Sequence, residues 1–159
     1  MPIFDPEPDY NLEEDFPNLQ ASGWELTSER DVKYNCIAYA AYDFRRRWEP
    51  SKGYYWPPGA NREDSVKGWC DAFRVLNYKD CEDDSHEPGF EKIAIYAKDG
   101  DPQHVARQLE SGVWTSKLGD DEDISHNTLE ALEGEFYGNV VALMKRQRFN
   151  HPSQDSPQT

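Results

Sequence analysis

Cys36 is the residue whose type and position most suggest chemistry in this sequence. It follows Asn35, a residue type that caps helix N-termini, and it opens a run of apolar residues at helical spacing: Ile37, Ala40, Ala41, Phe44 and Trp48. The free N–H groups and the dipole of a helix N-terminus favour a thiolate, so Cys36 is predicted to be a nucleophile. A small apolar residue opening a buried helix face fits the same position, and this structural interpretation stays open.

A cysteine nucleophile needs a base within hydrogen-bond reach, and histidine is the usual one. The chain contains four histidines, at His86, His104, His126 and His151. His86 lies in an acidic loop, His151 lies in a polar tail, and His126 adjoins a predicted helix start, where a surface position is expected. His104 opens a predicted strand, which is rigid enough to hold an imidazole against a helix N-terminus. His104 is therefore the predicted base.

A third residue should orient the imidazole of the base. If "ESG" forms a hairpin turn, Ala106 lies opposite Ser116, and Ser116 sits diagonally beside His104 on one face of the sheet. Ser116 is one candidate for this role. Three acidic residues that follow it are chemically better orienters and remain alternatives: Asp120, Asp121 and Asp123.

Two further residues are candidates for contact with a substrate. Asn35 precedes Cys36, so its side chain is predicted to donate to an oxyanion together with the backbone N–H of Cys36. Trp56 lies in the aromatic, proline-rich loop "SKGYYWPPG" and is predicted to line a substrate groove. Packing of Trp56 over the core is the alternative.

The elements that must position these residues change character along the chain. Helices are predicted over 36–48 and from about Asn61, the second with Val66, Trp69, Cys70, Phe73 and Leu76 on its apolar face. Strands are predicted at 90–97, 103–109, 113–119 and 137–149, with a short helix between residues 120 and 134. Helices followed by mostly antiparallel strands indicate an α+β fold.

The predicted domain lies between two less regular segments. Residues 1–20 are acidic and proline-rich and are expected to form an extended arm. A single domain is predicted for residues 21–149, and the polar residues 150–159 are predicted to form a disordered tail. The N-terminal stretch lacks the basic start and apolar run of a signal peptide, so a cytoplasmic location is expected, with signal-free secretion left open.

The composition excludes several classes of function. The 31 acidic and 17 basic residues give a net charge of -14, which disfavours nucleic-acid and membrane binding and favours a basic protein partner. The three cysteines and the histidines lack the spacing of a zinc site, so no metal is predicted. No cofactor is predicted either, because the sequence has neither GxxxxGK[ST] nor GxGxxG.

The order of a cysteine at a helix start, a histidine on a following strand and a polar residue on the next strand resembles the papain-like fold. "NCIAYA" and "HVA" resemble the cysteine and histidine segments of the NlpC/P60 and CHAP amidases and peptidases. The resemblance implies a papain-like core with Cys36 as nucleophile and His104 as base. The string "YNCIAYA…KIAIYA…HVARQL…WTSKLG…YG" is also similar to a family of uncharacterised bacterial proteins.

Two functions are predicted from these observations. The first is a cysteine-dependent hydrolase or acyl-transferase that acts on an amide, peptide or acyl bond, with a peptide- or amide-containing substrate, proteins included. The second is a non-catalytic acidic binding protein or immunity-type protein, with a papain-like fold that has lost its activity as one form of it.

Overall fold

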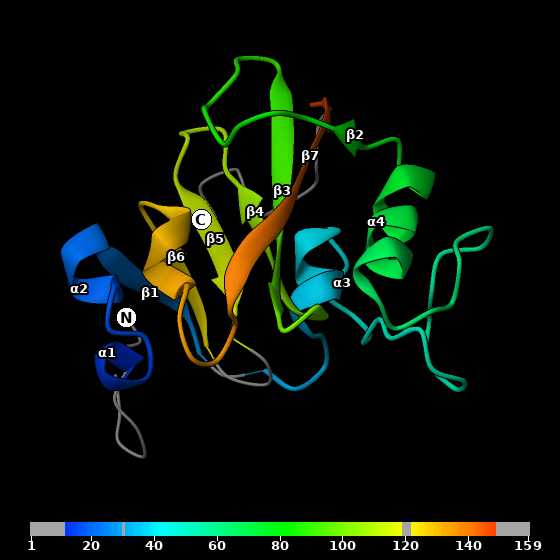
Figure 1. Ribbon diagram of the computed structural model, residues 1–159, viewed down its shortest axis with the longest axis horizontal. Helices are drawn as coiled ribbons and strands as arrows, with labels where there is room; N and C mark the ends of the chain where they lie inside the picture. Colours follow the sequence, from blue (N-terminus) through cyan, green and yellow to red (C-terminus); the bar gives the residue numbers. More distant parts are fainter. Residues whose placement is uncertain (1–11, 30, 119–121, 149–159) are drawn as a thin grey trace.

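The computed structural model describes residues 12–29, 31–118 and 122–148. Most of the predicted N-terminal arm, the predicted tail, His151 and the alternatives Asp120 and Asp121 lie outside the described residues. The described chain combines helices with one antiparallel sheet whose strands differ in length (Figure 1). The α+β prediction is therefore confirmed.

The domain contains a sheet of seven strands and several short helices. The helices are α1 (Leu12–Asp15), α2 (Leu19–Ser22), α3 (Cys36–Ala40), α4 (Val66–Val75) and the 3-10 helix η1 (Leu129–Leu132). The strands are β1 (Trp24–Ser28), β2 (Lys79–Asp80), β3 (Phe90–Lys98), β4 (Asp101–Gln108), β5 (Trp114–Lys117), β6 (Asp123–His126) and β7 (Asn139–Gln147). They lie in the order β1-β6-β5-β4-β3-β7-β2, and every neighbouring pair is antiparallel.

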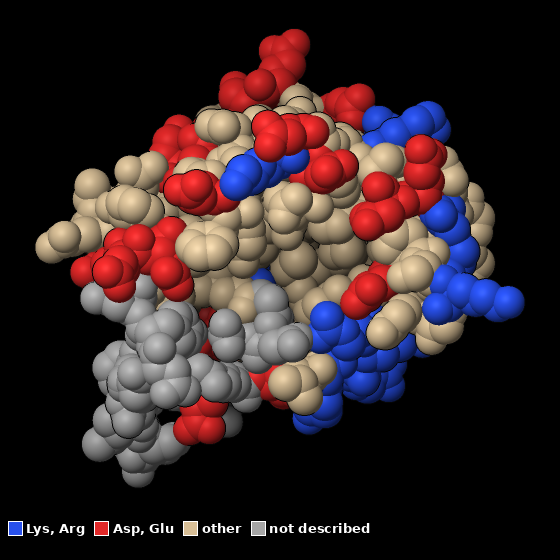
Figure 2. Space-filling view, turned by 60° about the horizontal axis from the view of Figure 1, so that its bottom comes forward, with Lys and Arg blue, Asp and Glu red and all other residues tan. Residues whose placement is uncertain are grey.

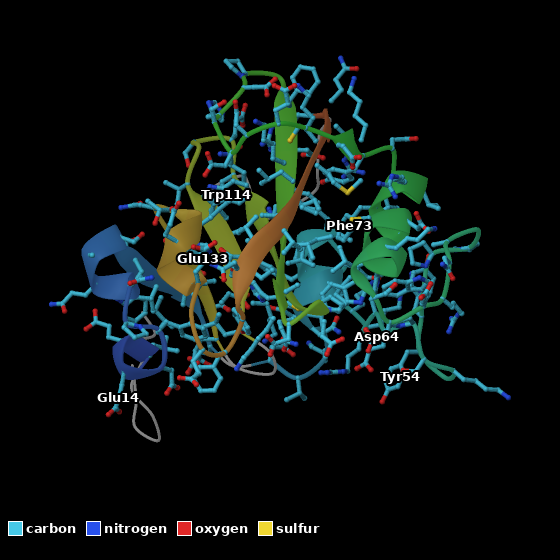
Figure 3. All side chains as sticks on the ribbon, viewed as in Figure 1. Glu14, Tyr54, Asp64, Phe73, Trp114 and Glu133 are labelled. Atoms are coloured by element: carbon cyan, nitrogen blue, oxygen red, sulfur yellow. The ribbon has the colours of Figure 1, made fainter. Side chains whose placement is uncertain are left out.

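The sheet separates two apolar cores. Helices α3 and α4 lie on one face, and α1, α2 and η1 lie on the other (Figure 1). Alternate residues of β3 divide accordingly: Ile95 belongs to the core under α3 and α4, whereas Tyr96 belongs to the core under α1 and α2. Figure 3 labels one member of each core, Phe73 in α4 and Trp114 in β5. The position of a residue along its strand thus decides which core its side chain enters.

The predicted hairpins are present. Asp99 and Gly100 connect β3 to β4 with φ angles of 52° and 86°, the positive pair that a two-residue hairpin requires. Gly112 lies in the turn between β4 and β5 with a φ angle of 97°. Arg107 pairs with Thr115, and continuing this antiparallel register by one residue places Ala106 opposite Ser116, as predicted. Both expectations for this part of the sheet are confirmed.

Helix α3 is much shorter than predicted and ends at Ala40 rather than at Trp48. Tyr42 adopts a left-handed φ angle of 67°, and the backbone N–H of Asp43 donates to the carbonyl of Ala38 at 2.9 Å. This six-to-one bond is typical of a Schellman helix end. Trp48 is buried, but it reaches the core from a bridge with Tyr55 and not from a helix face.

Helix α4 confirms the predicted apolar face but begins later than expected. Its N-cap is Ser65, whose hydroxyl accepts from the backbone N–H of Gly68 at 3.0 Å. The start predicted near Asn61 is therefore wrong by several residues. Trp69 and Phe73 on its inner face are buried against the sheet, and Cys70 is buried beside them, as predicted.

Two segments form a different type of secondary structure from the one predicted for them. Residues 123–126 form strand β6, and only 129–132 turn into a 3-10 helix, whereas a single helix was expected in this region. The predicted arm is helical from Leu12, and its apolar residues Leu12, Phe16 and Leu19 are buried in the second core. Burial of these three side chains explains why the segment folds onto the sheet and does not extend from it.

Candidate functional site

Asn35 caps helix α3 as predicted. Its side-chain oxygen accepts from the backbone N–H of Ala38 at 3.2 Å and from that of Trp48 at 3.1 Å. Its side-chain nitrogen donates to the carbonyl of Trp48 at 2.8 Å. The amide is buried and joins the helix start to the following loop. One hydrogen of this nitrogen is engaged by the backbone of Trp48, and the role of Asn35 as an oxyanion donor stays a prediction.

Cys36 opens α3 but lies in an environment that keeps its thiol protonated. Its side chain is buried in the core under α3 and α4. Burial raises the pKa of the Cys36 thiol to about 11, and a hydrogen bond from the backbone N–H of Val105 opposes this shift only in part. At neutral pH the sulfur is therefore a thiol in an apolar contact, and not the activated nucleophile predicted from its position.

His104 lies on the opposite face of the sheet from Cys36. It pairs with Tyr96 across β3 and β4, and its ring stacks on Tyr137 with centroids 4.4 Å apart. Neither ring nitrogen has a hydrogen-bond partner among the described residues. Val105, the next residue, is the one that enters the core of Cys36. The predicted Cys36–His104 pair is not formed, because neighbouring residues of a strand point to opposite faces.

Ser116 shares a face with His104, as predicted, but its partner is a different histidine. Its hydroxyl lies 2.8 Å from Nε2 of His126, and Nδ1 of His126 lies 2.9 Å from the carbonyl oxygen of Thr128. Ser116 and His126 are both fully buried, so the predicted surface position of His126 is wrong. Burial lowers the pKa of His126 to about 4. The pair links β5 and β6 inside the core, and no substrate can reach it.

A buried polar network occupies the face of the sheet that Cys36 shares. We call it the α3 network, and its members are Tyr34, Tyr39, Arg107, Thr115, Lys117 and Asp123. The hydroxyl of Tyr34 donates to Asp123 at 2.9 Å, and Nζ of Lys117 lies 3.9 Å from the same carboxylate. Asp123 therefore bonds within this network and does not orient an imidazole.

The α3 network also joins helix α3 to β4 and β5. The hydroxyl of Tyr39 lies 2.8 Å from that of Thr115, and Nε of Arg107 donates to the carbonyl of Tyr39 at 3.4 Å. Sequence reasoning missed this cluster. The signal was available in "HVARQ" and "WTSKL", where strict alternation places Arg107 with Val105, and Lys117 with Thr115, on one face.

Trp56 is buried and does not line either of the two grooves described for this protein. Its side chain is buried in the first core, and its indole N–H donates to the carbonyl of Asn61 at 2.9 Å. The alternative interpretation, aromatic packing over the core, describes Trp56 correctly. The role of Trp56 in substrate contact gains no support from this burial and stays a prediction.

The reactivity of the three cysteines tests this environment of Cys36. Because its pKa is about 11, only about one Cys36 thiol in a thousand is ionised at pH 8. We expect iodoacetamide to label the half-exposed Cys81 at least about tenfold faster than Cys36, as read by mass spectrometry of tryptic peptides over time. His104→Phe keeps an aromatic ring on Tyr137 and should leave the Cys36 rate unchanged. Faster labelling of Cys36 than of Cys81, abolished by His104→Phe, would restore the dyad.

Surface carboxylates gather where α1 meets the turn before β7. The acidic groove, as we call it, is lined by Glu14, Asp15, Pro17, Asn18, Glu133, Gly134, Glu135 and Phe136. Its volume is about 530 Å³, and Phe136 at its edge is 53% exposed. Figure 3 labels Glu14 on α1 and Glu133 after η1. No lysine or arginine lines the groove in the part of the chain that the structure describes.

The carboxylates of the acidic groove are largely unneutralised. Glu14, Asp15 and Glu135 form no ion pair with a described residue, while one oxygen of Glu133 accepts from the backbone N–H of Val140 at 3.0 Å. Lys98 approaches the same turn, but its ammonium donates to the backbone carbonyl of Glu135. On the face drawn in Figure 2, acidic side chains spread over the upper and left parts, whereas most basic side chains gather on the right.

The described residues contain neither a candidate metal-binding cluster nor a membrane-spanning helix. They contain no group of three or more histidine, cysteine or acidic side chains placed to hold a metal ion. None of their helices is long and apolar enough to cross a bilayer.

The described chain is thus an α+β domain whose sequence-predicted catalytic residues fall into two separate buried cores. Residues 25–145 match the model of a family described as a domain of unknown function, DUF7689. This match covers more than half of the chain, and the protein belongs to that family. No curated protein and no solved structure matches the sequence.

Proposed function

We propose that this chain is a non-catalytic binding protein that recognises a basic protein partner through the acidic groove. The observation that carries the proposal is a groove lined by four acidic residues and no described lysine or arginine, with an exposed aromatic side chain at its edge. An immunity-type or inhibitor protein is one form of this function.

The negative charge of the groove supports a basic partner, and an exposed aromatic side chain supports a protein partner. Carboxylates crowded at Glu14, Asp15, Glu133 and Glu135 repel one another, and lysine or arginine side chains of a partner would relieve this repulsion. The net charge of -14 steers a basic protein toward the molecule and accelerates its association. Phe136 offers the apolar anchor around which interface energy concentrates.

The fold that supports this function is, in our proposal, a papain-like core without its catalytic pair. Cys36 opens a helix that packs on β4, which is the arrangement that the resemblance implies. Val105, and not a histidine, contacts the sulfur, and the α3 network fills the neighbouring space. The cysteine-dependent hydrolase and its amide substrate stay a prediction from the sequence, without a base for Cys36 in this geometry.

A charge-reversal experiment tests the acidic groove. The probe is a fluorescent decapeptide of alternating lysine and leucine, with binding read by anisotropy at low and high salt. We expect its affinity to fall steeply with salt, and Glu14→Lys/Glu135→Lys to weaken it by at least about tenfold, because two unneutralised carboxylates become cations. Phe136→Ser should weaken binding with little change in the salt dependence.

The control has the same net charge but leaves the acidic groove intact. Glu82→Lys/Glu110→Lys reverses two exposed acids outside the groove. It should cost much less affinity than the groove variant. Equal losses in the two double variants would mean that the peptide senses only the net charge, and the proposed binding site would then be wrong.

A further inference from the structure

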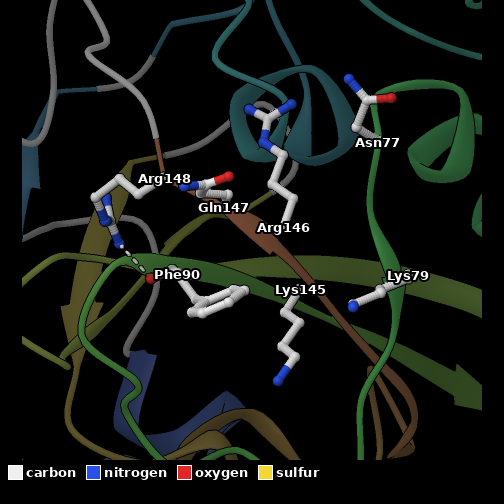
Figure 4. A pocket seen from close by; sticks show the side chains of 7 residues that line it. All are labelled: Asn77, Lys79, Phe90, Lys145, Arg146, Gln147 and Arg148. Atoms are coloured by element: carbon white, nitrogen blue, oxygen red, sulfur yellow. Dashed lines mark hydrogen bonds between the residues drawn. The ribbon is translucent and has the colours of Figure 1, made fainter.

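A second hollow, rich in cations, lies at the other end of β7 from the acidic groove. The basic groove, as we call it, is lined by Asn77, Lys79, Phe90, Lys145, Arg146, Gln147 and Arg148 (Figure 4). Its volume of about 800 Å³ falls in the range of small-molecule sites. Four of these seven residues are cations and none is acidic, in a protein whose net charge is -14.

The basic groove exists because β2 pairs with β7 over only two residues. Lys79 lies opposite Lys145, and Asp80 lies opposite Met144. Before Lys79 the chain leaves the sheet, and the backbone N–H of Tyr78 donates to the carbonyl of Phe73 at the end of α4. The end of β7 therefore has no neighbouring strand on its outer side, and its basic side chains border a hollow.

The charges around the basic groove do not balance. Glu87 accepts from Lys145 at 2.8 Å, and buried Glu91 holds Arg146 and Arg148. Lys145, Arg146 and Arg148 thus each have an acidic partner. Lys79 is exposed and forms no ion pair with the described residues.

The Lys79–Lys145 pair is the most informative part of the basic groove. The two lysines lie directly opposite each other in an antiparallel register, where like charges destabilise a sheet. Lys145 pairs with Glu87, which it shares with Lys92, and an anion between the two opposed lysines would attract both of them. Phe90 lies beside Lys145, whose ammonium is 4.8 Å from the ring centroid, and gives the groove an aromatic wall.

We propose that the basic groove binds a small organic phosphate that carries a planar ring. A phosphate monoester bears about two negative charges at neutral pH, so a single small group can attract both lysines of the opposed pair. The phosphate contacts Lys79 and Lys145, and the planar ring packs against Phe90. This site is independent of the acidic groove, so either proposal stands if the other fails.

Titration calorimetry at low salt tests the basic groove with adenosine monophosphate as the probe. We expect adenosine monophosphate to bind, adenosine not to bind measurably, and inorganic phosphate to bind more weakly than the nucleotide. Lys79→Ser should weaken nucleotide binding by about tenfold or more, because it removes a charge-assisted contact. Phe90→Leu should reduce the preference for the nucleotide over inorganic phosphate.

The matched control is Lys52→Ser, which removes one exposed lysine from a loop that does not line the basic groove. It should leave the nucleotide affinity unchanged within about twofold, since exposed charges at a distance are screened. The proposal is overturned if adenosine monophosphate does not bind, or if Lys52→Ser and Lys79→Ser weaken binding equally.

Discussion

Replacement of Glu91 by alanine is expected to lower the free energy of unfolding by about 3–5 kcal/mol. The Glu91 side chain is fully buried and forms ion pairs with the guanidinium groups of Arg146 and Arg148. The first of these arginines lies opposite Glu91 in the β3–β7 register, and it also donates to the carbonyl of Leu76 at 2.8 Å. Removal of the carboxylate takes a shared acidic partner away from two largely buried cations.

Urea denaturation followed by tryptophan fluorescence measures this loss. Glu25→Ala removes an exposed acid from β1 and should change stability by no more than about 0.5 kcal/mol. Glu91→Gln keeps the shape of the side chain and one acceptor oxygen, so we expect an intermediate loss. If Glu91→Ala were as stable as Glu25→Ala, the buried pairs would contribute little to folding, and the arginines of the basic groove would be positioned by other contacts.

The sequence predicted the sheet better than the site. Alternation and turn residues predicted β3, β4, β5 and β7, the Asp99–Gly100 hairpin turn and the register of Ser116. These features depend on local backbone preferences, which neighbouring residues determine. Asn35 as the cap of α3 is a local feature of the same kind.

The errors arose where distant contacts override local pattern. Apolar residues continue at helical spacing to Trp48, but Tyr42 turns the backbone into the left-handed region and ends α3. Residues 123–126 form a strand because β5 pairs with them on one side and β1, which lies far away in the sequence, pairs with them on the other. Such pairings cannot be deduced from a single segment.

The predicted site failed for a geometric reason. The sequence placed Cys36 on a helix and His104 on a strand, but it did not show which face of the sheet the helix covers. Once α3 is known to lie on the face of Val105, strand alternation alone separates the thiol from the imidazole. A pair of residues from two elements therefore depends on the packing of the whole domain.

The two buried histidines are expected to make the protein lose stability as the pH falls from about 6.5 to 4. Burial lowers the pKa of His126 from 6.5 to about 4, and burial together with nearby His126 lowers the pKa of His104 well below 6.5. The unfolded chain therefore binds protons first, so the stabilisation is complete above pH 6.5 and declines below it. His126 alone accounts for a loss of about 3 kcal/mol over this window.

The dependence of unfolding free energy on pH, measured by urea denaturation between pH 5 and 7, tests this prediction against a variant. His104→Phe retains a ring on Tyr137 without a titrating group, and should reduce the slope by up to about 1.4 kcal/mol per pH unit. His86→Gln, which replaces an exposed histidine, is the control variant. Asp123, whose pKa burial raises, acts in the opposite sense, so the difference between variants is the decisive quantity. Identical slopes in all three proteins would mean that the His104 ring is accessible to solvent. The stack of His104 on Tyr137 would then not be present in solution.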